Sequence, residues 1–372
     1  MRSLSVDVYR QPKTDRRLLA RKTAGQQFHS IHSATNKDDI LTIEHAIVRT
    51  KPKPWGSTDL RPWSQASTSD GPIGELWFER PSLPQSLPQS LAKGLAAPET
   101  ALLLKLLLTT EPLSIQVHPD DAFARSIGLA NGKTEAWYIL SAVAGAKVAV
   151  GLNYPRSAAE LRTAITDGSI ANIVHWHPVH QGDVISIPAG TIHAIGAGIV
   201  LAEIQQYSDA TFRLFDYGRQ RELHIENAVA VATAGPREVQ APPEQLSDAR
   251  IVLTVNPYFA LEQIDLAPGS VWRLDAPKET WLLAIEGHAQ LGSTTLSLGD
   301  AVFLQADHAD IEAGADGLKA LLAYPGPTIN PDALTERSAV GRIRHASLGA
   351  PLAPTSPGRA ALEQPEASNW PL

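Results

Sequence analysis

Short apolar runs separated by turn residues are the feature that most constrains the fold of this chain. Aliphatic and β-branched residues recur in brief segments between Gly, Pro, Asn and Asp, and the 372 residues include 26 Gly and 28 Pro. This spacing is typical of a β-sandwich or barrel and disfavours long helices. Strands are expected at 102–108, 113–118, 135–140, 147–151, 183–187, 191–195, 200–205 and 211–216.

Two helices are predicted among these strands. Ser157 and Glu160 have the spacing of a capping box, and an apolar stripe of Leu161, Ala164 and Ile165 follows them. A second helix is expected over residues 225–234, ending at Gly235. The predicted fold class is therefore all-β, with a small helical insertion near residues 155–177.

A weak internal repeat predicts two related β domains. The segment 133–137 resembles 278–281, with Glu135 and Glu279 144 residues apart, and the Gly-Asp pair at 182–183 recurs at 299–300, 117 residues on. Because Gly-Asp is also a common turn, chance remains an alternative. The expected parts are a polar extension (1–38), a metal-binding domain (39–240), a second, metal-free domain (241–345) and a Pro-rich tail (346–372).

Composition excludes several classes of protein. The chain has no Cys, so it contains neither disulfides nor thiolate metal sites, and any metal must be held by His, carboxylate or amide oxygen. The net charge is −7 without a basic stripe, which argues against nucleic acid as a partner. Apolar runs are too short or interrupted to cross a membrane. We expect a cytoplasmic monomer without a membrane partner.

His193 is the first candidate metal ligand. Residues 182–193 read G-x5-P-x-G-x2-H, which predicts a turn, a strand, a Pro-Gly bend and a strand that points its His inward. This spacing resembles the second signature of cupins, small jelly-roll barrels whose interior holds a metal. A lone buried His satisfied by its neighbours is the competing interpretation.

Three further residues are candidate ligands. Strand alternation places Gln116 and His118 on one face, although such a polar face could simply be solvated. Glu135 lies in an otherwise apolar and aromatic strand, where burial is costly unless the carboxylate is paired or metal-bound; an edge position in water is the alternative. This nitrogen and oxygen donor set suits zinc, with manganese or cobalt as other possible ions.

The second copy lacks such a site. Asp310 stands eleven residues after Gly299, where the first copy has His193 eleven after Gly182, and the Pro and Gly of the bend are absent. His308 is two residues out of this register and is expected at the surface.

Several segments together resemble the type I mannose-6-phosphate isomerases of the cupin superfamily, in their shorter bacterial form. The similarity spans roughly residues 40–330. It rests on segments 53–56, 72–77, 104–107, 113–121, 132–139, 182–196 and 203–219.

The resemblance implies two jelly-roll barrels and one zinc ion per chain, held by Gln116, His118, Glu135 and His193. It also implies interconversion of mannose 6-phosphate and fructose 6-phosphate through an enediol(ate), in mannose metabolism. By family position the catalytic residues are Arg213, Lys133 and Asp209, and the phosphate is bound by Lys105 and Ser114.

Other functions remain open at the level of sequence. A different metal-dependent cupin enzyme, such as a glucose-6-phosphate isomerase or an oxygenase, would use similar ligands. An oxygenase favours a facial triad with open positions for oxygen. A non-enzymatic sugar-binding cupin would not need Lys133, Asp209 or Arg213, all of which are present.

Overall fold

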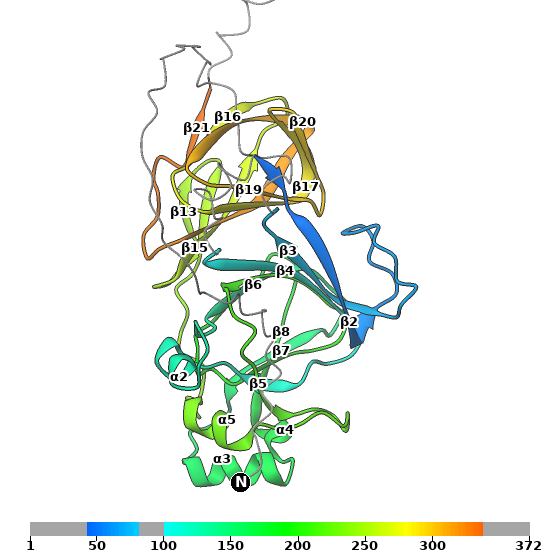
Figure 1. Ribbon diagram of the computed structural model, residues 1–372, viewed down its shortest axis with the longest axis vertical. Coiled ribbons are helices and arrows are strands. Elements are labelled where there is room, and N and C mark those ends of the chain that lie inside the picture. Colours follow the sequence, from blue (N-terminus) through cyan, green and yellow to red (C-terminus); the bar gives the residue numbers. More distant parts are fainter. Residues whose placement is uncertain (1–42, 82–99, 338–372) are drawn as a thin grey trace, which may run out of the picture. The chain divides into compact units, whose positions relative to one another are not determined.

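The computed structural model describes residues 43–81 and 100–337, which lie in one compact unit built mainly of β-sheet (Figure 1). The predicted extension at 1–38 and tail at 346–372 fall outside the described residues. No described helix is long and apolar enough to cross a membrane. The all-β fold class, with two barrels and few helices, is confirmed.

The first barrel consists of two facing sheets. The six-stranded sheet has the order β2-β3-β4-β11-β6-β9, and the five-stranded sheet has the order β12-β5-β10-β7-β8. Their strands are β2 (Ile47–Ser57), β3 (Ile73–Glu79), β4 (Leu102–Thr109), β5 (Ile115–Val117), β6 (Glu135–Ala142), β7 (Lys147–Leu152), β8 (Val174–Pro178), β9 (Val184–Ile187), β10 (His193–Ile195), β11 (Ile199–Gln206) and β12 (Phe212–Phe215). Each strand expected from the sequence has a counterpart here.

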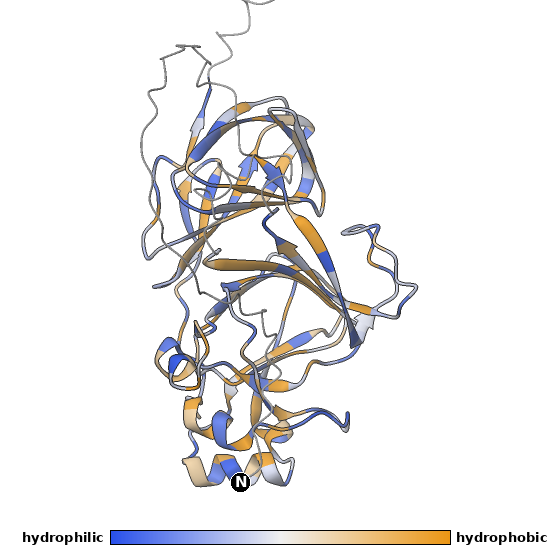
Figure 2. Cartoon of the chain, in the orientation of Figure 1, coloured by the Kyte–Doolittle hydropathy of each residue, from blue (hydrophilic) through white to orange (hydrophobic). Residues whose placement is uncertain are grey.

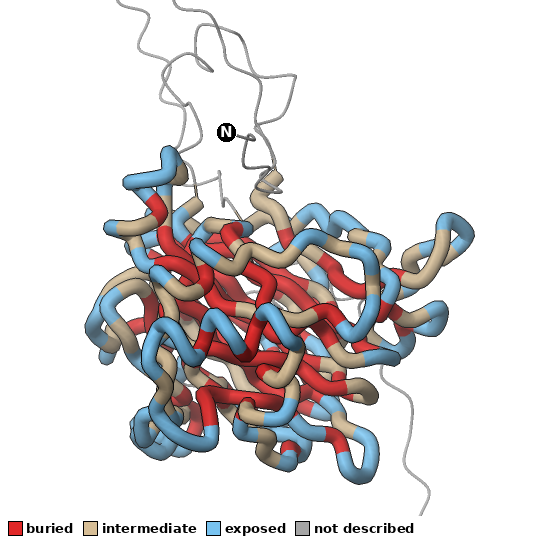
Figure 3. Tube along the Cα trace, turned by 90° about the horizontal axis from the view of Figure 1, so that it is seen from below, coloured by how far each residue is buried: buried red, intermediate tan, exposed pale blue. Residues whose placement is uncertain are grey.

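The helices are α2 (Asp121–Ser126), α3 (Ala158–Thr166), α4 (Ile170–Ile173) and α5 (Ile225–Val231). The Ser157–Glu160 capping box is present at the start of α3. Apolar residues of α3, α4 and α5 share a core with the outer face of the five-stranded sheet, and Figure 3 shows their outward faces exposed and the strands behind them buried. Helix α5 ends before the predicted residue 234, because Thr233 pairs with Thr191 and its N–H donates to the Gly190 carbonyl.

The second barrel is built from a ten-stranded sheet. Its path is β1-β19-β17-β20-β15-β14-β13, with β16, β18 and β21 pairing beside it. The strands are β1 (Glu44–His45), β13 (Glu244–Ser247), β14 (Arg250–Val255), β15 (Phe259–Leu266), β16 (Val271–Ala276), β17 (Thr280–Leu291), β18 (Thr294–Ser297), β19 (Ala301–Leu304), β20 (Asp307–Pro325) and β21 (Leu334–Glu336). The predicted domain limits stay a prediction. Strand β1 pairs with β19, so the described chain starts in this sheet before β2 enters the first barrel.

The two barrels share a hydrophobic core. Strand β4 is hydrophobic along most of its length (Figure 2) because both of its faces are buried. Leu104 and Leu106 pack in one cluster with Trp281, Leu283 and Phe303 of the second barrel. The opposite face of the six-stranded sheet, with Leu107, closes the interior of the first barrel.

The internal repeat is real, but its register differs from the one predicted. Asp183 and Asp300 close the same turn, each accepting a hydrogen bond from the N–H three residues earlier. The N–H of Gly182 donates to the Ile139 carbonyl and that of Gly299 to the Ala284 carbonyl, 145 residues apart.

The pairing of Glu135 with Glu279, at 144 residues, is therefore wrong by one position. A one-residue slip moves a side chain to the other face of a strand. Accordingly, Trp137 lies inside the first barrel whereas Trp281 lies in the core between the barrels. The local pattern was misleading because both Glu side chains accept a hydrogen bond from the indole two residues on.

Candidate functional site

Three polar side chains lie in one row across the five-stranded sheet. Strand β5 sits between β12 and β10, and Gln116 pairs in register with both Arg213 and His193. The neighbours of Gln116, Ile115 and Val117, point to the opposite face and are fully buried under the helices. The predicted alternation in this strand is confirmed, and it directs the polar face into the barrel.

A second row lies across the six-stranded sheet. Glu203 of β11 pairs in register with Lys105 of β4 and with Trp137 of β6. Glu203 and Lys105 are only 3% and 2% exposed. Each is a lone charge in an apolar strand, and pairing them across the sheet offsets part of the cost of burying either one. Burial and the nearby Glu135 carboxylate still raise the pKa of Glu203.

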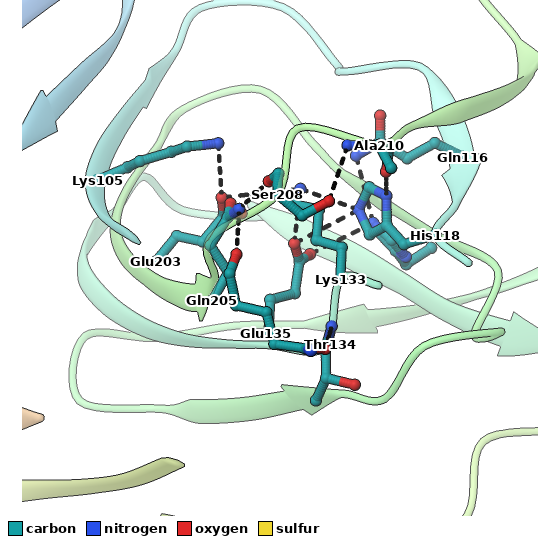
Figure 4. A network of polar contacts seen from close by, with 12 residues as sticks. Lys105, Gln116, His118, Lys133, Thr134, Glu135, Glu203, Gln205, Ser208 and Ala210 are labelled. Carbon is teal, nitrogen blue, oxygen red and sulfur yellow. Dashed lines mark hydrogen bonds and ion pairs between the residues drawn. The ribbon is translucent and has the colours of Figure 1, made fainter. Parts of the chain in front are cut away.

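His118, Glu135 and His193 converge between these rows. Figure 4 shows His118 and Glu135 on either side of Lys133, within the same network of polar contacts. One Glu135 oxygen lies 3.4 Å from Nε2 of His118 and the other lies 3.4 Å from Nε2 of His193. Glu135 is fully buried, so the edge position in water considered from the sequence is wrong. The three candidate ligand atoms lie within 4.8 Å of one another.

The orientation of both imidazoles suits metal binding. Nδ1 of His118 donates to the Ala210 carbonyl at 2.8 Å, and Nδ1 of His193 donates to the Thr191 carbonyl at 2.9 Å. Each Nε2 then carries a lone pair directed at the cluster. Metal-binding histidines usually donate their other ring N–H to a carbonyl or carboxylate in this way. Burial lowers the pKa of both rings, that of His118 to about 3, which keeps them neutral and able to ligate. The residues present fit a divalent cation.

Gln116 borders this cluster. Its Nε2 lies 3.3 Å from Nε2 of His193, and its Oε1 accepts a hydrogen bond from Ser114 at 3.2 Å. An amide ligates through its oxygen, so ligation by Gln116 requires the opposite amide orientation. The role of Gln116 as a fourth ligand stays a prediction.

Lys133 contacts two of the three candidate ligands. Its ammonium lies 2.8 Å from a Glu135 oxygen and 3.1 Å from Nε2 of His118. Burial lowers the pKa of Lys133, but the carboxylates of Glu135 and Glu203 outweigh that effect and raise it. In the same way, burial raises the pKa of Glu135, whereas the Lys133 charge brings it well below its usual value.

A line of alternating charges runs from this cluster toward the surface. Glu203 lies 3.9 Å from the Lys133 ammonium and 3.3 Å from that of Lys105. Glu75 of β3 comes next, 4.0 Å from Lys105 and 3.0 Å from Lys53. Lys105 is thus a buried, paired cation and not a surface lysine.

The same side chains line a pocket of about 180 Å³. Its lining includes five cationic side chains and three carboxylates. Two of these cations also pair with carboxylates outside the lining, Lys133 with Glu135 and Arg221 with Asp216. Lys and Arg side chains gathered in one pocket can bind a phosphate group through charge-assisted hydrogen bonds. The charged lining residues are Lys53, Lys105, Lys133, Arg213, Arg221, Glu75, Glu203 and Asp209.

The chain is similar in sequence to curated mannose-6-phosphate isomerases. It is 36% identical over 216 residues to one from Streptococcus mutans, covering 56% of this chain and 66% of that protein. One from Bacillus subtilis is 34% identical over 186 residues, covering 47% of this chain and 59% of the relative. The matched stretches are thus less than two thirds of these relatives. No family model matches the chain.

The fold extends this similarity over nearly the whole of a solved structure. The mannose 6-phosphate isomerase from Bacillus subtilis superposes with a TM-score of 0.65 and 27% identity, covering 75% of this chain and 98% of that one. This chain is thus similar to mannose-6-phosphate isomerases in both sequence and fold. Structures of phosphomannose isomerase variants from Salmonella typhimurium, at 18% identity and a TM-score of 0.59, share the fold.

The residues that the isomerase resemblance assigned all lie around one site. Ser114, Lys105, Lys133, Asp209 and Arg213 line the pocket. Arg213 is nearly buried and donates to the Glu222 carbonyl at 2.7 Å. Asp209 is exposed at the rim of the pocket. Their proximity is observed, and their individual roles remain predictions.

Sequence reasoning did not assign a role to four charged pocket residues, Glu203, Glu75, Lys53 and Arg221. Glu203 could have been identified from the sequence, because it is a charged residue inside an apolar strand, as Lys105 is. Arg221 lies two residues beyond the polar segment 203–219 and forms an ion pair with Asp216 of that segment. Glu75 has no such signal in the sequence, since its cations come from β2 and β4 only in the folded chain. His308 is half exposed, as predicted.

Proposed function

We propose that this protein is a zinc-dependent aldose-ketose isomerase that interconverts mannose 6-phosphate and fructose 6-phosphate through an enediol(ate). The observation that carries the proposal is the buried His118–Glu135–His193 group beside a pocket lined by five Lys and Arg side chains. The names of the relatives support the substrate.

The metal would be held by His118, Glu135 and His193, with Gln116 as the candidate fourth ligand. Two neutral imidazoles and a carboxylate form a ligand set typical of catalytic zinc, which keeps a position open for substrate oxygen. A bound divalent ion supplies Lewis-acid stabilisation of the negative charge that develops on the sugar oxygens.

The isomerisation moves one proton between the C2 and C1 carbons and another between the two oxygens. Lys133 and Asp209 are the candidate groups for these transfers, because both line the pocket next to the ligand cluster. Glu203, between Lys133 and Lys105, would hold the two ammonium groups in place as a positioning residue.

Arg213 would stabilise the enediolate, since it lies in the same row as Gln116 and His193 and faces the pocket. Preorganised positive charge at the position where negative charge develops is a strong catalytic contribution. Lys105 and Ser114, on the pocket wall, would bind the phosphate at the far end of the sugar.

The test is coupled-assay turnover of mannose 6-phosphate before and after chelator treatment, with zinc then restored. We expect activity that disappears with the chelator, returns with zinc and is lost in His193→Ala. Arg213→Ala should lower kcat by about two to three orders of magnitude. His308→Ala, in the second barrel, is the matched control and should be unchanged.

Stoichiometric metal without turnover of mannose 6-phosphate would contradict the isomerase proposal and favour another cupin enzyme or a sugar-binding protein. The cytoplasmic location and the monomeric state remain predictions. Size-exclusion chromatography with light scattering tests the second.

A further inference from the structure

The second barrel contains a pocket of its own. It has a volume of about 270 Å³. Its walls come from β16, β17, β20 and the loop at 326–333. This pocket therefore lies within one barrel and involves none of the residues of the proposed isomerase site.

The corrected register shows that this pocket occupies the position of the active site in the repeat. With 145 residues between equivalent positions, Lys278 stands in the place of Lys133 and Thr280 in the place of Glu135. Leu322 stands in the place of Glu203, because it pairs with Leu282 as Glu203 pairs with Trp137.

The side chains Lys278, Thr280 and Leu322 all line the second pocket. Lys133 and Glu203 likewise line the first pocket. Both barrels therefore have a pocket at the same position of the repeat, but the side chains that line the two pockets differ.

The floor of the second pocket offers no metal site. Thr280 replaces the ligating carboxylate, and its hydroxyl donates to the Lys278 carbonyl. Below it, Arg250 and Glu262 form a buried two-bond ion pair, at 2.8 and 2.9 Å, and the Tyr324 hydroxyl donates to Glu262. These charges compensate each other inside the protein, so they require no ligand to balance them.

Lys278 provides the pocket with an available positive charge. Its side chain is exposed, and within the described residues no carboxylate lies within 4.0 Å of its ammonium. The ammonium sits beside Gly326, 3.4 Å from the position where a Cβ there would lie. Asp275 also lines the pocket, but its carboxylate is bound by Arg273 at 3.2 Å. The rim therefore presents one cation without a carboxylate partner.

The remaining walls are largely apolar. A pocket with apolar walls and one charged group selects ligands that combine an apolar body with a complementary charge. A sugar phosphate does not match it, since a polyhydroxylated body would lose hydrogen bonds to water against such walls. The apolar wall residues include Leu274, Leu322, Ile329, Pro277, Pro325 and Pro331.

We propose that the second barrel binds a small organic monoanion, with its carboxylate at Lys278 and its apolar body against Leu274, Leu322 and Ile329. The pocket is a second ligand site of the protein, at the position in the repeat that the candidate metal site occupies in the first barrel. It is independent of the proposed isomerase function, because it shares no residue with the first pocket.

The test is titration of the full chain with fluorobenzoate, followed by fluorine NMR. We expect a dissociation constant on the order of 1 mM, as is typical of a ligand this small. Lys278→Gln should weaken binding about fivefold, the effect of one partly exposed ion pair. Lys319→Gln, a lysine of the same barrel paired with Glu286, is the matched control and should leave binding unchanged.

Two further measurements locate the site. Thr328→Trp, at the exposed rim of the pocket, should block binding, and the neutral fluorobenzamide should bind about fivefold more weakly than fluorobenzoate. Isomerase activity should be unaffected in these variants. No binding, equal binding by Lys278→Gln, or displacement of fluorobenzoate by mannose 6-phosphate would overturn the proposal.

Discussion

The charge of Glu75 makes a contribution to stability that can be predicted in size and in pH dependence. Glu75 is only 8% exposed. Burial raises the pKa of its carboxyl, but the ammonium groups of Lys105 and Lys53 and the indole N–H of Trp77, which donates at 2.6 Å, more than reverse this and lower it to about 2. Against an ordinary value of 4.5, this difference corresponds to about 3 kcal/mol in favour of the folded state at neutral pH.

The direction of the pH dependence of stability follows from proton binding. Because the pKa of Glu75 is lower in the folded chain, the unfolded chain binds more protons and stability falls as the pH falls. The contribution is complete above about pH 4.5 and is lost toward pH 2; at pH 3.5 about 2 kcal/mol should remain. Glu75→Gln removes the titrating group. Its deficit relative to wild type should therefore be about 3 kcal/mol at pH 7 and about 1 kcal/mol smaller at pH 3.5.

Urea unfolding at both pH values measures these differences, with chelator present in every sample so that metal binding does not contribute. Glu79→Gln is the matched control, because its ion pair with Arg49 is largely exposed. The control should lose no more than about 0.5 kcal/mol. A deficit for Glu75→Gln below about 1 kcal/mol at pH 7, or one that is equal at both pH values, would refute the electrostatic reasoning.

Three further outcomes are expected. Glu262→Leu leaves Arg250 buried without its carboxylate and should cost about 3–5 kcal/mol in urea unfolding, and adding Arg250→Met should restore most of that loss. Ser157→Ala removes the capping box of α3 and should cost about 1 kcal/mol by the same measurement, whereas no loss would show that the cap is dispensable. Chelator should lower the melting temperature of wild type but not of His193→Ala; an equal decrease in both would exclude His193 as a ligand.

Local patterns predicted the strands and the inward-facing His118, Glu135 and His193, because the relevant constraints are local. Alternation in β5 determines that Gln116 points into the barrel, and the costs of burying Glu135 indicate a partner for it. The G-x5-P-x-G-x2-H spacing places His193 on a short inward-facing strand, which is β10. Each of these features depends on residues that are close together in the sequence.

Features that depend on contacts distant in sequence could not be predicted in this way. The cations around Glu75 come from β2 and β4. The early end of α5 depends on the pairing of Thr233 with Thr191. The register of the repeat was misjudged because the Glu279–Trp281 hydrogen bond imitates the Glu135–Trp137 one. Only the pairing of whole strands distinguishes the interior face from the face between the barrels.

Glu279 accepts hydrogen bonds from the backbone N–H groups of Ala101 and Leu102, at 2.6 and 3.0 Å, where β4 begins. Strand β4 carries Lys105 into the first pocket, so a carboxylate of the second barrel anchors a strand that lines the candidate active site. Substitutions in the second barrel are therefore constrained during evolution, because any that move Glu279 also displace β4 and Lys105. This constraint holds although the second barrel contributes no side chain to the described residues of the first pocket.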